Sequence, residues 1–93
     1  MKEQVLPVSK TLEDRGKDYG SFKDQTMLTQ DIKRSFKSGK NWENLNDAQK
    51  ESLEMIATKI SRILNGNPNK EDTWHDIAGY ATLVEKEIRG EGV

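Results

Sequence analysis

Residues 48–64, AQKESLEMIATKISRIL, place their large aliphatic side chains at helical spacing. At about 100° per residue, one arc of roughly 100° holds the following side chains: Leu53, Ile56, Ile60, Ile63 and Leu64. An apolar stripe of this kind has to be buried, so it predicts a helix packed against other elements. Asn46 or Asp47 is a suitable cap for its start. The NGNP that follows ends the helix, because Asn–Gly at Gly66 is typical of a left-handed terminus and Pro68 cannot continue a helix.

A second amphipathic segment precedes this one, between Ser21 and Gly39. Ser21 is a good helix cap, and Asp24 three residues later favours the positive end of the helix dipole. The apolar side chains of this segment repeat mainly at every fourth residue: Phe22, Met27, Leu28, Ile32 and Phe36. We therefore predict a helix that ends near Gly39, followed by a connection anchored by Trp42 and Leu45.

A third helix is predicted from about Asp72 to Arg89. Its apolar side comprises Trp74, Ile77, Ala78, Ala81, Val84 and Ile88. Before the first helix, TLEDRG predicts a single helical turn ended by Gly16, and KDYG is a turn signal. No segment has the alternation of a strand. We predict an all-α, antiparallel bundle of three main helices plus a short N-terminal helical turn, with residues 1–10 flexible, 11–89 as one domain and 90–93 as a flexible tail.

The composition limits the classes of function. The chain has 93 residues, of which 32% are hydrophobic and 33% charged, so its core is small and a partner subunit would supply what one chain lacks. The formal charge of -1 provides no field that would attract duplex nucleic acid. Cysteine is absent, and no run of apolar residues is long enough to span a membrane. We expect a cytoplasmic protein that forms homo-oligomers and binds neither membranes nor duplex nucleic acid.

Two acidic pairs are candidate metal ligands. Glu51 and Glu54 are three residues apart on one predicted helix, and Asp72 and Asp76 are four apart on the next. Each pair projects from one side of its helix, and four carboxylates on two antiparallel helices suit a hard cation such as Mg²⁺. Acidic pairs also arise easily in so charged a chain, so an ordinary solvated surface is the alternative. Glu51 in particular lies opposite the apolar arc, as do Met55, Thr58 and Arg62.

Cationic and aromatic residues are candidates for binding phosphate or a base. Lys59 and Arg62 lie on the same predicted helix as the first acidic pair, and Arg15 and Tyr19 lie in the turn before the first main helix. Arginine and lysine bind phosphate, and an aromatic ring stacks on a base. Alternatively, Lys59 and Arg62 cover the core with their aliphatic stems. No Ser-His-Asp set and no glycine-rich phosphate loop is present.

The last helix carries a second surface away from the Trp74 side, formed by Asp76, Gly79, Tyr80 and Leu83. Glycine inside a helix costs about 1 kcal/mol relative to alanine. We therefore interpret Gly79 as a position of close packing, with simple tolerance of glycine on a surface as the alternative. Tyr80 and His75 join the candidate nucleotide-binding residues, although His75 is more typical of a polar residue early in a helix than of a catalyst.

Three stretches carry a resemblance to a known group: RGKDYGSF, LEMIATKISRILNGNP and EDTWHDIAGYATLV. Over about residues 15–88 the chain resembles small proteins encoded by bacteriophages and prophages, which are related to the all-α MazG-like nucleotide pyrophosphohydrolases. Those enzymes carry a Glu-x-x-Glu pair and a Glu-Glu-x-x-Asp motif that hold Mg²⁺ against a nucleoside triphosphate. The resemblance aligns Glu51 and Glu54 with the first motif, and DTWHD with the second. Thr73 stands where the second glutamate would be, so one carboxylate is missing. The resemblance also implies a dimer or higher assembly that covers the acidic face.

Three functions follow from these observations. The first is a phage protein that binds, without turnover, a host nucleotide or a nucleotide immune signal such as a cyclic nucleotide, in an infected or lysogenic bacterium. The second is an active Mg²⁺-dependent pyrophosphohydrolase with Glu51, Glu54, Asp72 and Asp76 as metal ligands. The third is a non-catalytic interaction module in which these charges lie on the surface. The missing carboxylate at Thr73 favours the first over the second.

Overall fold

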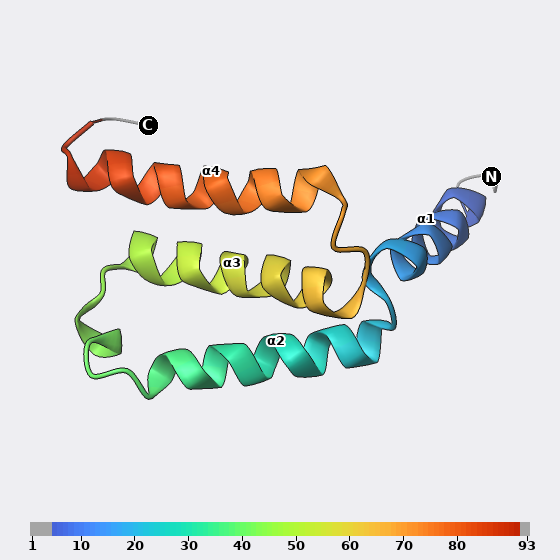
Figure 1. Ribbon diagram of the computed structural model, residues 1–93, viewed down its shortest axis with the longest axis horizontal. Coiled ribbons are helices and arrows are strands. Elements are labelled where there is room, and N and C mark those ends of the chain that lie inside the picture. The colour runs from blue at the N-terminus through green and yellow to red at the C-terminus, as the bar shows by residue number, and fades with distance from the viewer. Residues whose placement is uncertain (1–4, 92–93) are drawn as a thin grey trace.

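The computed structural model describes the backbone of residues 5–91 and the side chains of residues 8–91. Its helices are α1 (Val5–Tyr19), α2 (Phe22–Lys37), the 3₁₀ turn η1 (Trp42–Asn44), α3 (Asp47–Asn65) and α4 (Glu71–Ile88), and there is no strand among the described residues. Figure 1 shows α2, α3 and α4 side by side in antiparallel order, with α3 in the middle and α1 projecting from one end. The predicted all-α bundle with three main antiparallel helices is confirmed.

The starts of α2 and α3 follow the predicted capping chemistry. The Ser21 hydroxyl accepts a hydrogen bond from the Asp24 backbone N–H at 3.2 Å. At the start of α3, Asn46 is the cap: its side chain accepts from the Gln49 N–H at 2.8 Å, and the Gln49 side chain accepts from the Asn46 N–H at 3.0 Å. This reciprocal pair satisfies backbone donors that have no partner within the helix.

The N-terminal segment is more helical than predicted. The expected single turn ended by Gly16 is wrong, because α1 is a helix of 15 residues that begins at Val5 and continues through Gly16 to Tyr19. Glycine lowers helix propensity without preventing helix formation, and Gly20, at φ +80°, is where the chain turns. The flexibility predicted for residues 1–10 and 90–93 stays a prediction, and residues 1–4 and 92–93 lie outside the described part of the chain.

Since α3 packs against α2 on one side and α4 on the other, the predicted division of α3 into one buried and one exposed face is only partly right. Ser52, Ala57 and Ser61 are its buried residues. Met55, Thr58 and Arg62, placed on the exposed face by the sequence pattern, are half-buried, and Leu64, placed in the stripe, is exposed. A central helix needs two contact faces, and an assignment based on one apolar arc finds only one of them.

The inward face of α4 is also rotated relative to the prediction. Thr73 is buried and Asp76, Ile77, Tyr80 and Val84 are half-buried, whereas Trp74 is 54% exposed. The other predicted apolar residues that turn out to be exposed are Ala78, Ala81 and Ile88. The Trp74 indole N–H donates to the Pro68 carbonyl at 2.8 Å, which holds the ring against the α3–α4 connection instead of the core.

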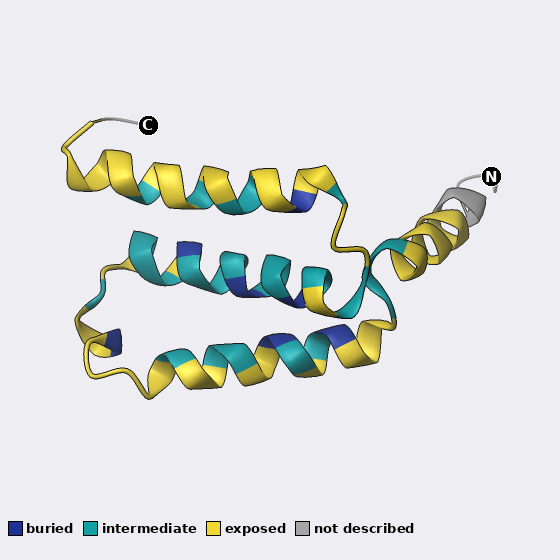
Figure 2. Cartoon of the chain, in the orientation of Figure 1, coloured by how far each residue is buried: buried dark blue, intermediate teal, exposed yellow. Residues whose placement is uncertain are grey.

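The three main helices form essentially one layer, so little side-chain surface is fully buried (Figure 2). Among the described residues, Trp42 and Ala57 are the buried hydrophobic ones, and Trp42 stacks on Phe36 with ring centroids 5.8 Å apart. The exposed large apolar side chains include Phe22 at 79% and Leu83 at 47%. The radius of gyration is 16.0 Å, against about 12 Å for a compact domain of this length.

Candidate functional site

The end of α1 is fixed against the end of α3 by backbone contacts. The Asn65 side-chain amide donates to the Tyr19 carbonyl at 3.0 Å and to the Ser21 carbonyl at 3.3 Å, and the Asn67 N–H donates to the Asp18 carbonyl at 2.6 Å. A Cβ at Gly20 would lie 2.4 Å from the Asn65 carbonyl oxygen, so no larger residue fits there. These contacts place the α1–α2 turn beside the last turn of α3.

Gly66 allows close approach of two backbone segments at this junction, and it does not form the predicted left-handed helix terminus. Its φ of −136° and ψ of −136° are not left-handed, so the predicted left-handed terminus is wrong. A Cβ at Gly66 would instead lie 2.2 Å from the Asp18 carbonyl oxygen and 2.4 Å from the Tyr19 Cα. Glycine is required here because the backbones of α1 and of the α3–α4 connection approach so closely.

At this junction, two guanidinium groups lie near one aromatic ring. The Arg62 guanidinium carbon is 4.4 Å from the centroid of the Tyr19 ring, and that of Arg15 is 5.9 Å away. Among residues 8–91, no carboxylate pairs with either arginine. The Arg62 Nε is fully buried without a hydrogen-bond partner in the described part of the protein. Cation–π contact with Tyr19 positions both charges and leaves their hydrogen-bonding capacity unused.

The two arginines line a pocket of about 350 Å³. Its wall consists of Leu12, Arg15, Gly16, Tyr19, Gly20, Ser21, Phe22, Gln25 and Arg62. A second pocket, of about 260 Å³, adjoins it and shares Phe22, Gln25 and Arg62. The fold therefore brings together three of the candidate residues predicted from the sequence, Arg15, Tyr19 and Arg62.

Lys59, a further candidate for phosphate, is engaged elsewhere. Its ammonium group lies 2.9 Å from an Asp76 carboxylate oxygen, and its side chain is only 12% exposed. The hydrogen bond from Lys59, together with its positive charge, lowers the pKa of Asp76. This ion pair connects the middle of α3 to the first half of α4.

The four candidate metal ligands are spread along the helices. With Lys59 opposite Asp76 and α3 antiparallel to α4, a rise of about 1.5 Å per residue puts Glu54 and Asp72 roughly 13 Å apart along the helix axes. Glu51 and Asp72 are exposed and Glu54 is half-buried. Over the described residues, no three His, Asp or Glu side chains are grouped so as to hold a metal ion. A Mg²⁺ site built from these carboxylates stays a prediction, and it would need more than one chain.

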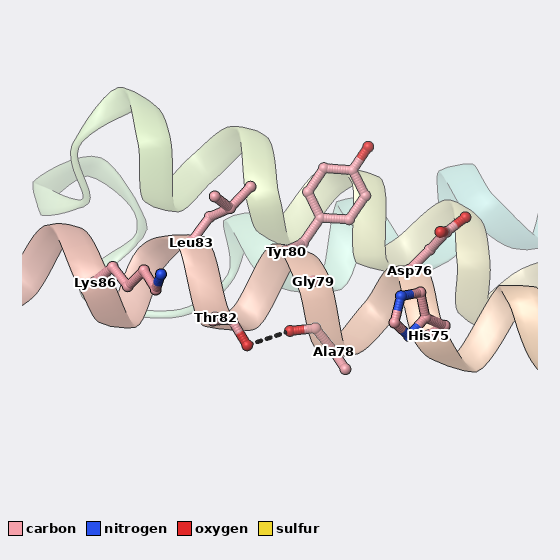
Figure 3. A pocket seen from close by; sticks show the side chains of 8 residues that line it. All are labelled: His75, Asp76, Ala78, Gly79, Tyr80, Thr82, Leu83 and Lys86. Atoms are coloured by element: carbon pink, nitrogen blue, oxygen red, sulfur yellow. Dashed lines mark hydrogen bonds between the residues drawn. The ribbon is translucent and has the colours of Figure 1, made fainter. Parts of the chain in front are cut away.

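His75 and Tyr80 lie on a separate, open groove of α4, of about 660 Å³. Figure 3 shows Asp76, Tyr80 and Leu83 projecting from one side of the helix, and His75 and Thr82 from the other. Gly79 faces open space, since a Cβ built there would meet nothing within 4 Å. Within one chain, the predicted close packing at Gly79 is therefore absent among the described residues, because none of the described elements covers that position of α4.

Several pocket residues were not identified from the sequence. The apolar pattern of α2 includes Phe22, and it gives no functional role to Gln25, Thr29 or Lys33. Gln25 and Thr29 are buried side chains, four residues apart, and both contact the Ser61 hydroxyl. The available signal was a pair of polar residues at helical spacing beside an apolar stripe, which indicates a polar contact between helices.

The chain belongs to a family defined only as a domain of unknown function, DUF6378, whose model matches residues 7–88. The match covers α2, α3, α4 and nearly all of α1, and it includes every candidate site residue named above. No curated protein and no solved structure is significantly similar to the chain. In the described residues, no helix is long and apolar enough to cross a membrane.

Proposed function

We propose that this protein binds a nucleotide without hydrolysing it, and that it is a phage product that sequesters a host nucleotide or a nucleotide immune signal. One observation carries the proposal: two arginines, which have no carboxylate partner among residues 8–91, converge on one aromatic ring at the edge of a pocket. The whole chain has a formal charge of -1, so this cluster is a local excess of positive charge.

The pocket has the groups that a nucleotide requires. Guanidinium groups bind phosphate through two parallel hydrogen bonds, and these charge-assisted bonds are about twice as strong as neutral ones. Tyr19 is half-buried beneath the guanidinium of Arg62, whereas the Phe22 ring is 79% exposed on the pocket wall. Phe22 is thus available to stack on a base, and the arginines to bind the phosphate attached to it.

Two features favour binding over hydrolysis. Asp76, which the resemblance to MazG-like enzymes makes a metal ligand, is neutralised by Lys59 at 2.9 Å. Thr73, which replaces a glutamate of the enzymes, is buried and 4% exposed. A pyrophosphohydrolase would need Asp76 released from Lys59 and additional carboxylates brought next to it. We retain the MazG-like relationship as a proposal that rests on the Glu51–Glu54 spacing and on the order of the helices.

We further propose that the protein acts as a homo-oligomer. One layer of three helices buries little apolar surface, and apolar side chains remain exposed along α2 and α4. Leu83 and the open side of Gly79 lie in the α4 groove, where a second chain could approach the backbone closely. Burial of these apolar side chains between subunits would stabilise the assembly by about 25 cal/mol for each Å² of apolar surface removed from water.

A binding assay with product analysis tests the function. The purified protein is incubated with nucleotides, cyclic dinucleotides and Mg²⁺, and free ligand is measured by chromatography before and after heat denaturation. Ligand that disappears and returns intact on heating supports sequestration. Pyrophosphate or a monophosphate product would instead indicate the enzyme, and ligand that stays free and intact throughout would favour the interaction module.

Variants connect the result to the pocket. Arg62→Ala removes a charged donor, so we expect a loss of affinity of about 10- to 150-fold, which corresponds to ~1.5–3 kcal/mol. Arg34→Ala is the matched control, because Arg34 is exposed on α2, pairs with Asp31 and lines neither pocket. Equal effects of the two substitutions, measured by isothermal titration calorimetry, would refute the assignment of the pocket.

A further inference from the structure

The arginine pocket and its neighbour form one divided cavity. They meet at a wall that both share, made by Phe22, Gln25 and Arg62. Resting on the nucleotide-binding function proposed above, we propose that the ligand is a dinucleotide, two nucleosides joined through phosphate, with the linking phosphate at Arg62 and one nucleoside in each pocket.

The volumes support a ligand with two parts. The second pocket, at about 260 Å³, falls below the range of roughly 300–1,000 Å³ typical of small-molecule sites, and the first, at about 350 Å³, lies near its lower end. Taken together they lie well within this range. A mononucleotide would fill one pocket and leave the other to solvent, whereas a dinucleotide would use both.

The linings of the two pockets differ in their neutral polar groups. Besides the shared Arg62, each pocket has one further cation, Arg15 in the first and Lys33 in the second. The other groups in the second pocket are mostly neutral hydrogen-bonding side chains: Gln25, Thr26, Thr29, Gln30 and Thr58. Neutral amides and hydroxyls match the edges of a base and the hydroxyls of a sugar better than they match a chain of phosphates.

The shared wall is held in place before any ligand binds. The Gln25 amide donates to the Thr29 hydroxyl at 3.2 Å and to the Ser61 hydroxyl at 3.1 Å, and Arg62 lies against the Tyr19 ring. A wall fixed by buried hydrogen bonds loses little entropy on binding. Its one cation, Arg62, has no ion-pair partner among residues 8–91, and a single linking phosphate would supply one.

Lys33 is the residue that separates one-pocket from two-pocket binding. Lys33 lines the second pocket and not the first, and it forms no ion pair in the described part of the chain. Lys37, one helical turn further along α2, is exposed and lines neither pocket, so Lys37→Ala is a matched control.

The test compares ligands by isothermal titration calorimetry on the full chain. The probes are a 5′-mononucleotide, the nucleoside triphosphate, the 5′-phosphorylated linear dinucleotide with a 3′–5′ phosphodiester, and the dinucleoside diphosphate, each in the adenine, guanine, cytosine and uracil series. We expect one of the two dinucleotide types to bind at least 10-fold more tightly than the mononucleotide and the triphosphate. Lys33→Ala should remove most of that gain and leave mononucleotide affinity unchanged, and Lys37→Ala should change neither.

The alternatives give different results. A triphosphate that binds more tightly than both dinucleotides would show that a polyphosphate chain fills the second pocket, and would overturn the inference while leaving nucleotide binding intact. Equal affinity for mononucleotides and dinucleotides, or an equal effect of Lys33→Ala on both, would do the same. Absence of binding for every probe would overturn the proposed function as well.

Discussion

Ser61→Ala tests the buried polar contact that fixes α2 against α3. The Ser61 hydroxyl is fully buried, accepts a hydrogen bond from the Gln25 amide at 3.1 Å and donates to the Thr58 carbonyl at 2.8 Å. It also contacts the Thr29 hydroxyl. Since Gln25 and Thr29 line the proposed site, the same contact supports the fold and the pocket wall.

The loss of stability expected for Ser61→Ala follows from the buried Gln25 amide, which the substitution leaves without its acceptor on Ser61. Removing one partner from a buried hydrogen bond costs about 1–3 kcal/mol, because the remaining donor loses its water as well as its acceptor. Alanine regains about 0.5 kcal/mol through its higher helix propensity. The measured decrease in the free energy of unfolding should therefore be about 0.5–2.5 kcal/mol, or a fall in Tm of roughly 4–8 °C for each kcal/mol in a domain of this size.

Ser52→Ala is the matched control for this measurement. Ser52 is a buried serine on the same helix, and its hydroxyl forms no hydrogen bond within residues 8–91, so only the gain in helix propensity remains. Urea unfolding followed by circular dichroism should give similar m values for both variants and midpoints that move in opposite directions. A difference of less than about 0.5 kcal/mol between them would refute a structural role for the Ser61 hydroxyl.

Two further predictions concern the junction and the ion pair. Gly66→Ala would place a Cβ 2.2 Å from the Asp18 carbonyl oxygen, so we expect α1 to detach and its amide hydrogens to exchange faster. Gly79→Ala is the control, because the added Cβ meets open space and should raise the stability of α4 by about 1 kcal/mol. Unchanged exchange in α1 would contradict the close approach at Gly66. Because Lys59 lowers the Asp76 pKa in the folded protein, their pair contributes stability above the ordinary carboxyl pKa of about 3.9, and this contribution is lost as pH falls through the lower folded value. In an NMR titration, Lys59→Met should raise the Asp76 pKa, and an unaltered value would exclude Lys59 as the cause.

The fold was predictable to the extent that local signals determine it. Caps at Ser21 and Asn46, apolar repeats along α2 and α3, and the stop at Pro68 placed three helices and their antiparallel order. The position of α3 between two neighbours was not predictable, because one apolar arc gives one contact face. The second face of α3 is built from Ser61 and small neighbours, and hydropathy does not distinguish buried serines from solvated ones.

The same reasoning explains which site residues were found. Arg15 and Tyr19 were noticed for their chemistry, and their approach to Arg62 depends on contacts more than 40 residues apart in the chain, such as that of Asn65 with the Tyr19 carbonyl. The sequence therefore indicates which side chains have suitable chemistry, and only the fold shows that these side chains lie next to one another. Lys59 illustrates the converse, since its charge made it a candidate for binding phosphate, while the fold pairs it with Asp76 on α4.

The arrangement of charges links the thin fold to its proposed role. In the middle of α3, Lys59 is neutralised by Asp76, so the Lys59 charge needs no ligand to balance it. Near the end of α3, Arg62 and Arg15 have no carboxylate partner among residues 8–91, and they lie at a junction held by Gly66 and Asn65. Uncompensated like charges this close repel each other in the free protein, and an anion between them removes that repulsion. Ligand binding should therefore stabilise the α1–α3 junction more than the α3–α4 contact, which makes protection of α1 amides the most direct sign of an anionic ligand.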